Sequence, residues 1–287
     1  MTVRSYAKIN LGLRILGKRS DGFHELQTVF HRVNLYDTIR FERTENGVSL
    51  DTDHADIPRD RSNLCIRAAE TVLRGTSDAG VHMDLQKCIP AGAGLGGGSS
   101  NAATVLRILP PLLGLDIPAE ELHEMAATLG SDVPFFLHEG SALARGRGEV
   151  LDHFSWSCPW WILLVVPDVH VSTAWAYARL RLQRYQDQLD MRSALMRAHD
   201  RPEALETLLH NDFEDAVMEK HPVIRRVKER LREGGASGAL MSGSGSSVFG
   251  LFRDEQTALR CEGEFPEHYV TALTAPGFSP DGFDRAA

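Results

Sequence analysis

A glycine-rich segment places the strongest constraint on how this chain folds. It reads Pro90-Ala-Gly-Ala-Gly-Leu-Gly-Gly-Gly-Ser-Ser-Asn101 and lies between a strand predicted at 81–85 and a helix predicted at 101–109. Consecutive glycines let backbone N–H groups point into one concavity without side-chain obstruction. The helix N-terminus adds a positive partial charge, and Ser99 or Ser100 is expected to cap that helix. The segment therefore predicts a cradle for phosphate groups rather than a flexible linker.

Three better-known motifs also match parts of the chain, and each fails on its context. The glycines at 92–97 have the GxGxxG spacing of dinucleotide sites, but Pro90 interrupts the passage from strand to loop and no βαβ run surrounds it. Residues 12–18 read GxxxxGK, yet Arg19 follows where a P-loop needs Ser or Thr. Residues 5–8 match the SxxK of serine acyl-enzymes, but no KTG follows. A phosphate loop of another kind remains.

Composition narrows the classes of partner. The 31 basic and 39 acidic residues give a net charge of −8, and neither half of the chain has a basic excess. Binding to nucleic acid or to an anionic membrane surface is therefore not expected, so a local site must hold any anionic ligand. The longest apolar run, 160–166, is too short to span a bilayer. The N-terminus lacks the apolar stretch of a secretory signal, and the four cysteines are too scattered for a disulfide or zinc framework. We expect a cytoplasmic protein.

The pattern of elements favours an α+β fold in two halves that meet near 150–159. The first forty residues alternate as strands, and residues 47–51 are expected to form an edge strand. A helix with a Ser62 cap is predicted to follow, and Pro110 with Pro111 is expected to stop the helix that begins at Asn101. Helices are predicted later at 118–130, 173–198, 202–218, 222–233 and 254–263, with strands at 160–166, 248–252 and 268–274.

Three further features are ambiguous when each is considered alone. Lys8 shares a strand face with Asn10, and a lysine there is usually solvated. Asp132 precedes a predicted helix, where a carboxylate usually serves as an N-cap. The run 242–247, Ser-Gly-Ser-Gly-Ser-Ser, reads either as a plain turn or as a second loop that closes over the same ligand.

Taken together and in order, these segments resemble a known family. Residues 7–11 (AKINL), 90–102, 130–135 (GSDVPF) and 242–248 (SGSGSSV) are similar to the motifs of the GHMP kinases, small-molecule kinases with a phosphate loop that is not a Walker A motif. Residues 19–26 (RSDGFHEL) resemble the members that act on 4-diphosphocytidyl-2-C-methyl-D-erythritol. The similarity runs from Lys8 to about Val248, which is nearly the whole chain.

The resemblance implies a fold and a reaction. The fold is a two-domain GHMP kinase fold, with residues 1–153 like ribosomal protein S5 domain 2 and residues 154–287 ferredoxin-like. The active site would lie between the domains. The reaction implied is transfer of the γ-phosphoryl group of ATP, as its Mg²⁺ complex, to the 2-hydroxyl of the cytidylyl substrate, a step of non-mevalonate isoprenoid biosynthesis.

The resemblance also implies roles for individual residues. Lys8 and Asp132 match the catalytic pair, acting more to orient and neutralise charge than as a strong base. The ATP site would comprise Asn63, Leu64, Lys87, Pro90, Ala91, Gly92, Ala93, Gly94, Leu95, Gly96, Gly97, Gly98, Ser99, Ser100 and Gly243. The substrate site would comprise Asn10, Phe23, His24, Thr173 and Tyr177. Ser100 or its neighbour is the candidate for Mg²⁺.

Two departures and two alternatives remain open. Phe23 stands where these kinases usually have Tyr, and Arg145 and Arg147 have no assigned role. Another GHMP kinase, of the homoserine or mevalonate type, is the nearest alternative, and residues 21–26 argue against it. A nucleotide-binding protein that has lost catalysis is the other, and the presence of both Lys8 and Asp132 argues against that.

Overall fold

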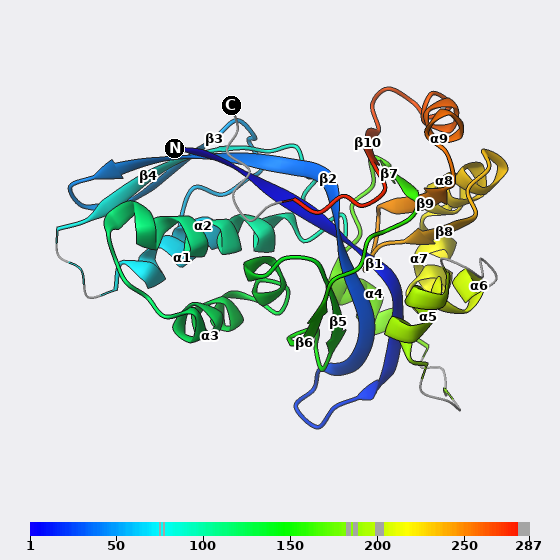
Figure 1. The fold of residues 1–287 in the computed structure, drawn as a ribbon, viewed down its shortest axis with the longest axis horizontal. Coiled ribbons are helices and arrows are strands. Elements are labelled where there is room, and N and C mark those ends of the chain that lie inside the picture. The colour runs from blue at the N-terminus through cyan, green and yellow to red at the C-terminus, as the bar shows by residue number, and fades with distance from the viewer. Residues whose placement is uncertain (75, 77, 182–184, 186–188, 199–203, 281–287) are drawn as a thin grey trace.

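The computed structural model describes residues 1–74, 76, 78–181, 185, 189–198 and 204–280 (Figure 1). Its first half contains β1 (Thr2–Lys18), β2 (His24–Thr44), β3 (Gly47–Thr52), α1 (Leu64–Val72), β4 (Gly80–Gln86), α2 (Gly97–Leu113), α3 (Ala119–Leu129), the short 3-10 helix η1 (Pro134–Leu137), β5 (Ser141–Arg145) and β6 (Val150–Phe154). Its second half contains β7 (Trp161–Val166), α4 (Thr173–Arg179), α5 (Met191–Ala198), α6 (Ala204–Leu208), α7 (Glu214–Lys220), α8 (Pro222–Glu233), β8 (Gly238–Met241), β9 (Val248–Phe252), α9 (Glu255–Glu262) and β10 (Val270–Thr274).

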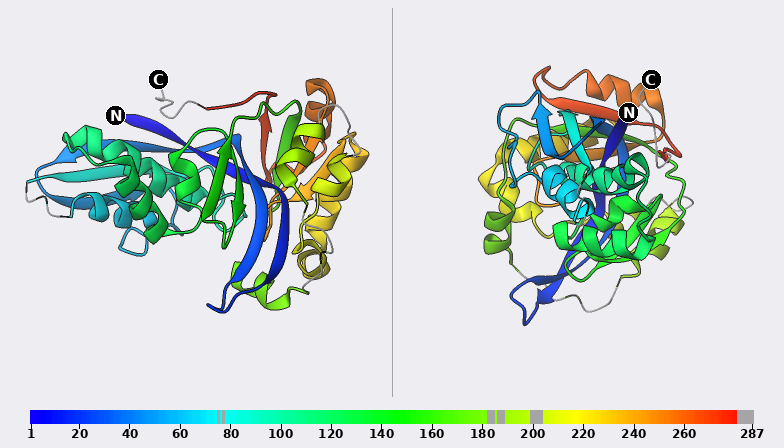
Figure 2. Two further views of the ribbon diagram at one scale, coloured as in Figure 1. Left: turned by 60° about the horizontal axis from the view of Figure 1, so that its bottom comes forward. Right: turned by 90° about the vertical axis from the view of Figure 1, so that its left-hand side faces the viewer.

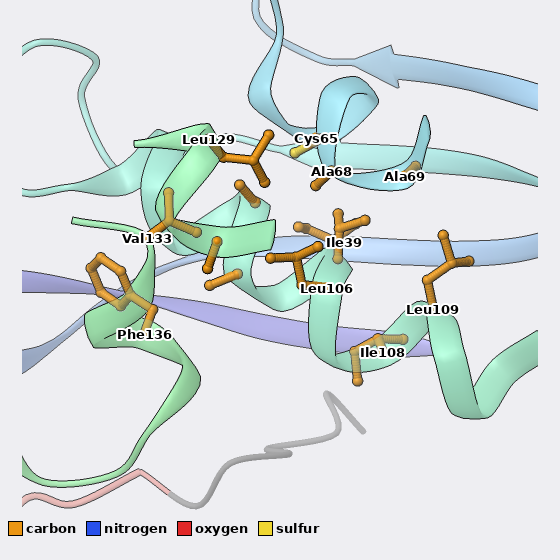
Figure 3. Close-up of a cluster of buried hydrophobic side chains, with 14 of the residues drawn as sticks. Ile39, Cys65, Ala68, Ala69, Leu106, Ile108, Leu109, Leu129, Val133 and Phe136 are labelled. Carbon is orange, nitrogen blue, oxygen red and sulfur yellow. The ribbon is translucent and has the colours of Figure 1, made fainter. Parts of the chain in front are cut away.

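The first sheet has the order β3-β4-β2-β5-β6, and β1 pairs antiparallel with β2. Strand β3 is an edge strand, as the sequence predicts, and it runs parallel to β4. Helices α1, α2 and α3 lie together on one face of this sheet (Figure 1). Their side chains meet in a buried core that includes Cys65, Leu106 and Leu129 (Figure 3). That core fixes helix α2, and therefore the loop that leads into it.

The second sheet is antiparallel, with the order β10-β7-β9-β8. Reading along the chain, β7, helices, β8, β9, α9 and β10 follow one another, which is the β-α-β-β-α-β arrangement of a ferredoxin-like domain. The predicted two-domain α+β fold is confirmed. Among the helices in the described part of the chain, none has the length and apolar character that crossing a bilayer requires.

The two long strands β1 and β2 connect the two halves. β1 starts and β2 ends beside β4 in the first half, and the hairpin that joins them projects from the molecule (Figure 2). Leu13 and Ile15 pack into the core of the second half, and the Leu13 N–H donates to the carbonyl of His210 at 2.7 Å. The chain leaves the first sheet after Phe154 and enters the second at Trp161. The predicted boundary at 153/154 stays a prediction, and part of the hairpin packs beyond it.

Several predicted boundaries are wrong, each for a local reason. Asn63, not Ser62, caps helix α1, because its side-chain oxygen accepts the Cys65 N–H. Pro110 and Pro111 do not stop helix α2, which continues to Leu113. They lie in the last turn of the helix, where few backbone hydrogen bonds are lost. It ends at Gly114, whose φ of 72° suits a helix C-terminus.

The helices predicted at 173–198 and 202–218 are each interrupted. The first segment contains α4 and α5, and the second contains α6 and α7. Ser172 caps α4 by accepting the Trp175 N–H. Parts of both predicted helices lie outside the described residues. These parts are 182–184 and 186–188 in the first helix and 202–203 in the second.

Candidate active site

The glycine-rich loop runs from strand β4 into helix α2, as the sequence predicts. Gly92, Gly94 and Gly96 have φ of 68°, 78° and 68°, a region that favours glycine. Gly96 is the N-cap residue and contributes no side chain, so neither Ser99 nor Ser100 caps the helix and that prediction is wrong. A helix start without a side-chain cap leaves its first N–H groups available to an anion.

A cavity of about 330 Å³ lies against this loop. Most of the residues predicted to bind ATP line it: Asn63, Leu64, Lys87 and every residue from Pro90 to Ser99. Leu64 and the Asn63 side chain reach the cavity from the start of helix α1. The loop and the start of α1 thus line one space.

Ser100 faces away from this cavity. Its side chain is buried, and its hydroxyl donates to the Tyr6 carbonyl at 2.7 Å while accepting from the Ser5 hydroxyl at 2.8 Å. Ser99, one residue earlier, lines the cavity. Of the two serines, Ser99 is the one that borders the cavity.

The second glycine cluster, residues 242–247, packs against the glycine-rich loop. The Ser242 hydroxyl donates to the Gly94 carbonyl at 3.0 Å, and the Ser247 hydroxyl donates to the Ala93 carbonyl at 2.7 Å. A Cβ atom at Gly243 would lie 3.3 Å from Gly94, so the two backbones are in close contact. Gly243 is not among the residues that line the cavity. The two loops are therefore in contact, and Gly243 contacts the glycine-rich loop at Gly94, not the cavity.

Lys8 and Asp132 form an ion pair beside the loop. Lys8 Nζ lies 3.4 Å from Asp132 Oδ2, and it donates to Asn10 Oδ1 at 2.8 Å and to the Gly94 carbonyl at 3.4 Å. The Lys8 side chain is only 5% exposed, whereas that of Asp132 is 32% exposed. The solvated-lysine interpretation of Lys8 is therefore wrong. A fixed ammonium group joins the phosphate loop to an accessible carboxylate.

Two of the predicted substrate residues, His24 and Tyr177, contact each other near Asp132. The His24 and Tyr177 rings stack with centroids 5.0 Å apart, and the Phe213 ring packs edge-on against Tyr177. Burial raises the pKa of Tyr177, and the nearby negative charge of Asp132 raises it further. Burial lowers the pKa of His24, as does the charge of Lys18. The stack is thus placed next to the catalytic candidates.

Thr173 and Asn10 have polar partners within the same region. The Thr173 hydroxyl lies 2.8 Å from the Ser244 hydroxyl, which joins the start of α4 to the second glycine cluster. Asn10 is buried; besides its bond to Lys8, its Nδ2 donates to Thr28 Oγ1 at 2.9 Å. Asn10 is therefore a support for Lys8 in this structure.

Phe23 occupies the exposed end of the hairpin. Its side chain is 53% exposed, and the Arg147 guanidinium lies over its ring at 4.7 Å. The turn around Arg147 is tied to the hairpin, since the Gly146 N–H donates to Glu25 Oε1 at 2.9 Å. Arg147 therefore has a contact that the sequence did not suggest, with one face of the Phe23 ring.

Sequence reasoning missed Asp37, which is fully buried and holds the backbone just before the loop. The strand alternation carried a signal for it, because Asp37 has the same parity as Val33, Leu35 and Ile39, which are buried. It also missed Asn211, whose Nδ2 donates to the carbonyls of Met241 and Gly243 and so holds the second cluster.

No group of three metal-ligating side chains lies at the loop within the described residues. The group that does occur, Asp51, His82 and Asp84, is on strands β3 and β4. A metal ion at the loop would therefore depend on the phosphates for most of its ligands, as Mg²⁺ usually does.

Comparison with known proteins agrees with this geometry. A family model described as the GHMP kinases N terminal domain matches residues 63–140, and one described as GHMP kinases C terminal matches residues 191–271. A curated 4-diphosphocytidyl-2-C-methyl-D-erythritol kinase of Chlorobium phaeobacteroides (strain BS1) is 44% identical over 282 residues, 97% of this chain and 98% of that protein. The one from Chlorobium luteolum (strain DSM 273 / BCRC 81028 / 2530) is 45% identical over 286 residues, covering 97% and 98%.

Solved structures give the same result. A crystal structure of 4-(cytidine 5'-diphospho)-2C-methyl-D-erythritol kinase matches with a TM-score of 0.82 at 34% identity, covering 97% of this chain and 100% of that one. A homoserine kinase from Cytophaga hutchinsonii matches with a TM-score of 0.72 at 19% identity, covering 96% and 95%, which shows a shared fold.

The fold and the phosphate loop thus define a kinase of the GHMP class. Within that class, the chain belongs to the family of 4-diphosphocytidyl-2-C-methyl-D-erythritol kinases.

Proposed function

We propose that this protein transfers the γ-phosphoryl group of ATP to the 2-hydroxyl of 4-diphosphocytidyl-2-C-methyl-D-erythritol. The observation that carries the proposal is the Lys8–Asp132 pair, 3.4 Å apart, at the edge of the glycine loop. The loop supplies amides for phosphates, Lys8 contacts the loop carbonyl of Gly94, and Asp132 is exposed enough to meet an acceptor. The identity of the relatives supports the choice of acceptor.

ATP would bind with its phosphates on the loop and its base toward helix α1. The N–H groups from Gly96 to Ser99 begin helix α2, where the positive end of the helix dipole favours anions. Leu64 offers an apolar surface to the base, and Lys87 lies on the wall of the same cavity.

Transfer to the acceptor then needs orientation and charge neutralisation more than strong base catalysis. The acceptor oxygen forms a bond to the γ-phosphorus while the bond from that phosphorus to the β–γ bridging oxygen breaks, so ADP leaves. Asp132 orients the hydroxyl and receives its proton late in the step. Lys8 holds Asp132 in place and offsets charge on the moving phosphoryl group.

Mg²⁺ fits this arrangement as a companion of ATP. Ser99 presents a hydroxyl to the cavity and Asp132 a carboxylate beside it, which suits an ion held by one or two protein oxygens plus phosphates. When bound, the ion neutralises charge on the β- and γ-phosphates.

The cytidine end of the acceptor would lie at the His24–Tyr177 stack. Aromatic carbons pack at about 3.5–4 Å, so a base between two rings needs roughly 7 Å, more than the 5.0 Å observed between these centroids. The base therefore binds against an outer face or an edge of the pair, with Thr173 nearby on helix α4. We also propose residues 1–153 and 154–287 as the domains, and the cytoplasm as the place of action.

An acceptor panel tests the proposal. The purified protein is given Mg-ATP with the cytidylyl substrate, homoserine or mevalonate, and ADP release is measured together with the phosphorus NMR signal of the product. We expect turnover with the cytidylyl substrate and at most background with the other two. Faster turnover of homoserine or mevalonate would overturn the acceptor assignment. If none of the three acceptors leads to ADP release, the proposed catalytic function is overturned.

A further inference from the structure

The buried carboxylate of Asp37, next to the phosphate loop, accepts hydrogen bonds on both of its oxygens. Asp37 lies in strand β2 and its side chain is 0% exposed. Its Oδ1 accepts the N–H groups of Cys88 and Ile89, each at 2.8 Å. Its Oδ2 accepts Asn101 Nδ2 at 2.9 Å and also binds the Lys87 ammonium.

These partners flank the loop on both sides. Cys88 and Ile89 come immediately before Pro90, where the loop begins, and Asn101 is in the first turns of helix α2, where the loop has ended. Lys87 also approaches the helix start, because a Cβ atom at Gly97 would lie 3.3 Å from its Nζ. A single side chain therefore fixes the entry of the loop, its exit and the lysine on the cavity wall.

This arrangement matters because the loop is rich in glycine. Glycine loses more conformational freedom on ordering than any other residue, so an unanchored loop would have to be ordered when a ligand binds. The Asp37 carboxylate also offsets the Lys87 ammonium, which otherwise faces the positive end of helix α2 in a buried position.

We propose that Asp37 is a positioning residue for ATP: it holds both ends of the phosphate loop and Lys87 in the geometry that binds the nucleotide. This inference rests on the proposed function to the extent that ATP occupies the loop cavity. The alternative is a buried ion pair that contributes to stability alone. The two roles differ in what they change, because positioning affects ATP affinity and stability alone does not.

The test is Asp37→Asn in the full chain. The substitution keeps the shape and one accepting oxygen, but it places an amide donor against the donors of Lys87 and Asn101. We expect the KM and Kd for ATP to rise roughly 10- to 100-fold, the size expected when a charge-assisted hydrogen bond is lost. The KM of the acceptor should stay within about 3-fold. Asp212→Asn is the matched control, since Asp212 is 1% exposed and accepts the Ile15 N–H at 2.6 Å, away from the loop.

The control should lower Tm and leave ATP affinity unchanged. If Asp37→Asn also lowers Tm and leaves ATP affinity unchanged, Asp37 is structural and the proposal is overturned. If Asp37→Asn does not fold, Asn101→Ala decides, read against Ser5→Ala. Asn101→Ala removes the bond to Asp37 at the helix end of the loop together with the bonds of Asn101 to Ser5 and Lys87, whereas Ser5→Ala removes only the Ser5 side of that set. A 3- to 10-fold weaker ATP affinity in Asn101→Ala with an unchanged one in Ser5→Ala supports the proposal, and an unchanged affinity in Asn101→Ala overturns it. Calorimetry with ATP gives this answer even if the wild type turns over no acceptor, so failure of the proposed function is seen separately.

Discussion

At the scale of single residues, the Lys8–Asp132 pair makes the sharpest prediction. Asp132→Asn and Lys8→Met should each lower kcat by at least ~10²-fold, because each removes charge from the transferring site. The KM for ATP should change little, since backbone amides hold the phosphates. Steady-state kinetics of both variants and of the double variant measure this, with the exposed Asp152→Asn as a control.

The variant that combines Lys8→Met with Asp132→Asn shows whether the two residues act as one unit or independently. The Lys8 ammonium is bonded to Asn10 and the Gly94 carbonyl, and it lies against Asp132, so removing one partner already disables the other. The combined loss should therefore be close to that of the worse single variant. A double variant whose loss equals the product of the two single losses would contradict the coupling.

Tyr177 is the second residue with a clear prediction. It supports His24 by stacking and is itself supported by Phe213. Tyr177→Ala should raise the KM of the cytidylyl substrate roughly 5- to 150-fold, corresponding to ~1–3 kcal/mol of base stacking, and leave the KM for ATP unchanged. Tyr177→Phe should retain the stack. Trp175→Ala, on the same helix but packed against His221 and Lys220, is the control. Equal losses for ATP and acceptor would reduce Tyr177 to a packing residue.

At the scale of elements, the glycine loop is defined by its contacts with the second cluster. Gly94 has a φ of 78°, and a Cβ atom there would lie 2.2 Å from the Ser242 carbonyl oxygen. Gly94→Ala should therefore separate the two loops and weaken ATP binding by more than ~10-fold, since a left-handed residue costs about 1 kcal/mol before any clash. Calorimetry with ATP and melting of the apo protein measure the two effects.

A neighbouring glycine provides the comparison for stability. At Gly98 a Cβ atom meets Leu64 Cδ1 at 3.7 Å, which is ordinary contact, and the residue lies inside helix α2. Gly98→Ala should keep or raise Tm, because alanine favours a helix over glycine by roughly 0.5–1 kcal/mol. If Gly94→Ala melts like Gly98→Ala, the contact between the loops is not what holds the cradle.

The same loop shows how far sequence reasoning reaches. A run of glycines between a strand and a helix was sufficient to predict the cradle, because backbone freedom and the helix dipole are local properties. The capping role of Ser99 or Ser100 was not predictable, since Gly96 takes the cap and the Ser100 hydroxyl finds Tyr6, a residue distant in sequence.

At the scale of the whole molecule, the alternating pattern and the order of motifs predicted two α+β halves. What joins the halves was not predicted. Strands β1 and β2 are long enough to contribute to both cores, and the Ile15 N–H reaches Asp212 in the second half. Such contacts depend on residues almost two hundred positions apart, and one sequence does not specify that pairing.

Buried histidine makes the fold as a whole sensitive to acid. His31 is 3% exposed, its Nδ1 is 2.9 Å from the Ser141 hydroxyl, and its Nε2 has no hydrogen-bond partner within the described residues. Burial lowers the pKa of His31 to about 4, and the positive charge of Arg32 acts in the same direction. The folded state therefore keeps this ring neutral at pH values where the unfolded chain takes up a proton.

The sign of the pH dependence follows from that difference. Above about pH 6.5 neither state is protonated at this position, so the contribution of His31 to stability is fully present; it falls as the pH drops from 6.5 toward 4. Between pH 7.5 and 5.0 His31 should cost the wild type about 2 kcal/mol of unfolding free energy. Urea unfolding at the two pH values measures this decrease in unfolding free energy. The decrease should be smaller by about that amount in His31→Gln than in the wild type, whereas His268→Gln, at an exposed position, should show the wild-type decrease. Equal losses in all three proteins would show that His31 is not the group that couples this fold to pH.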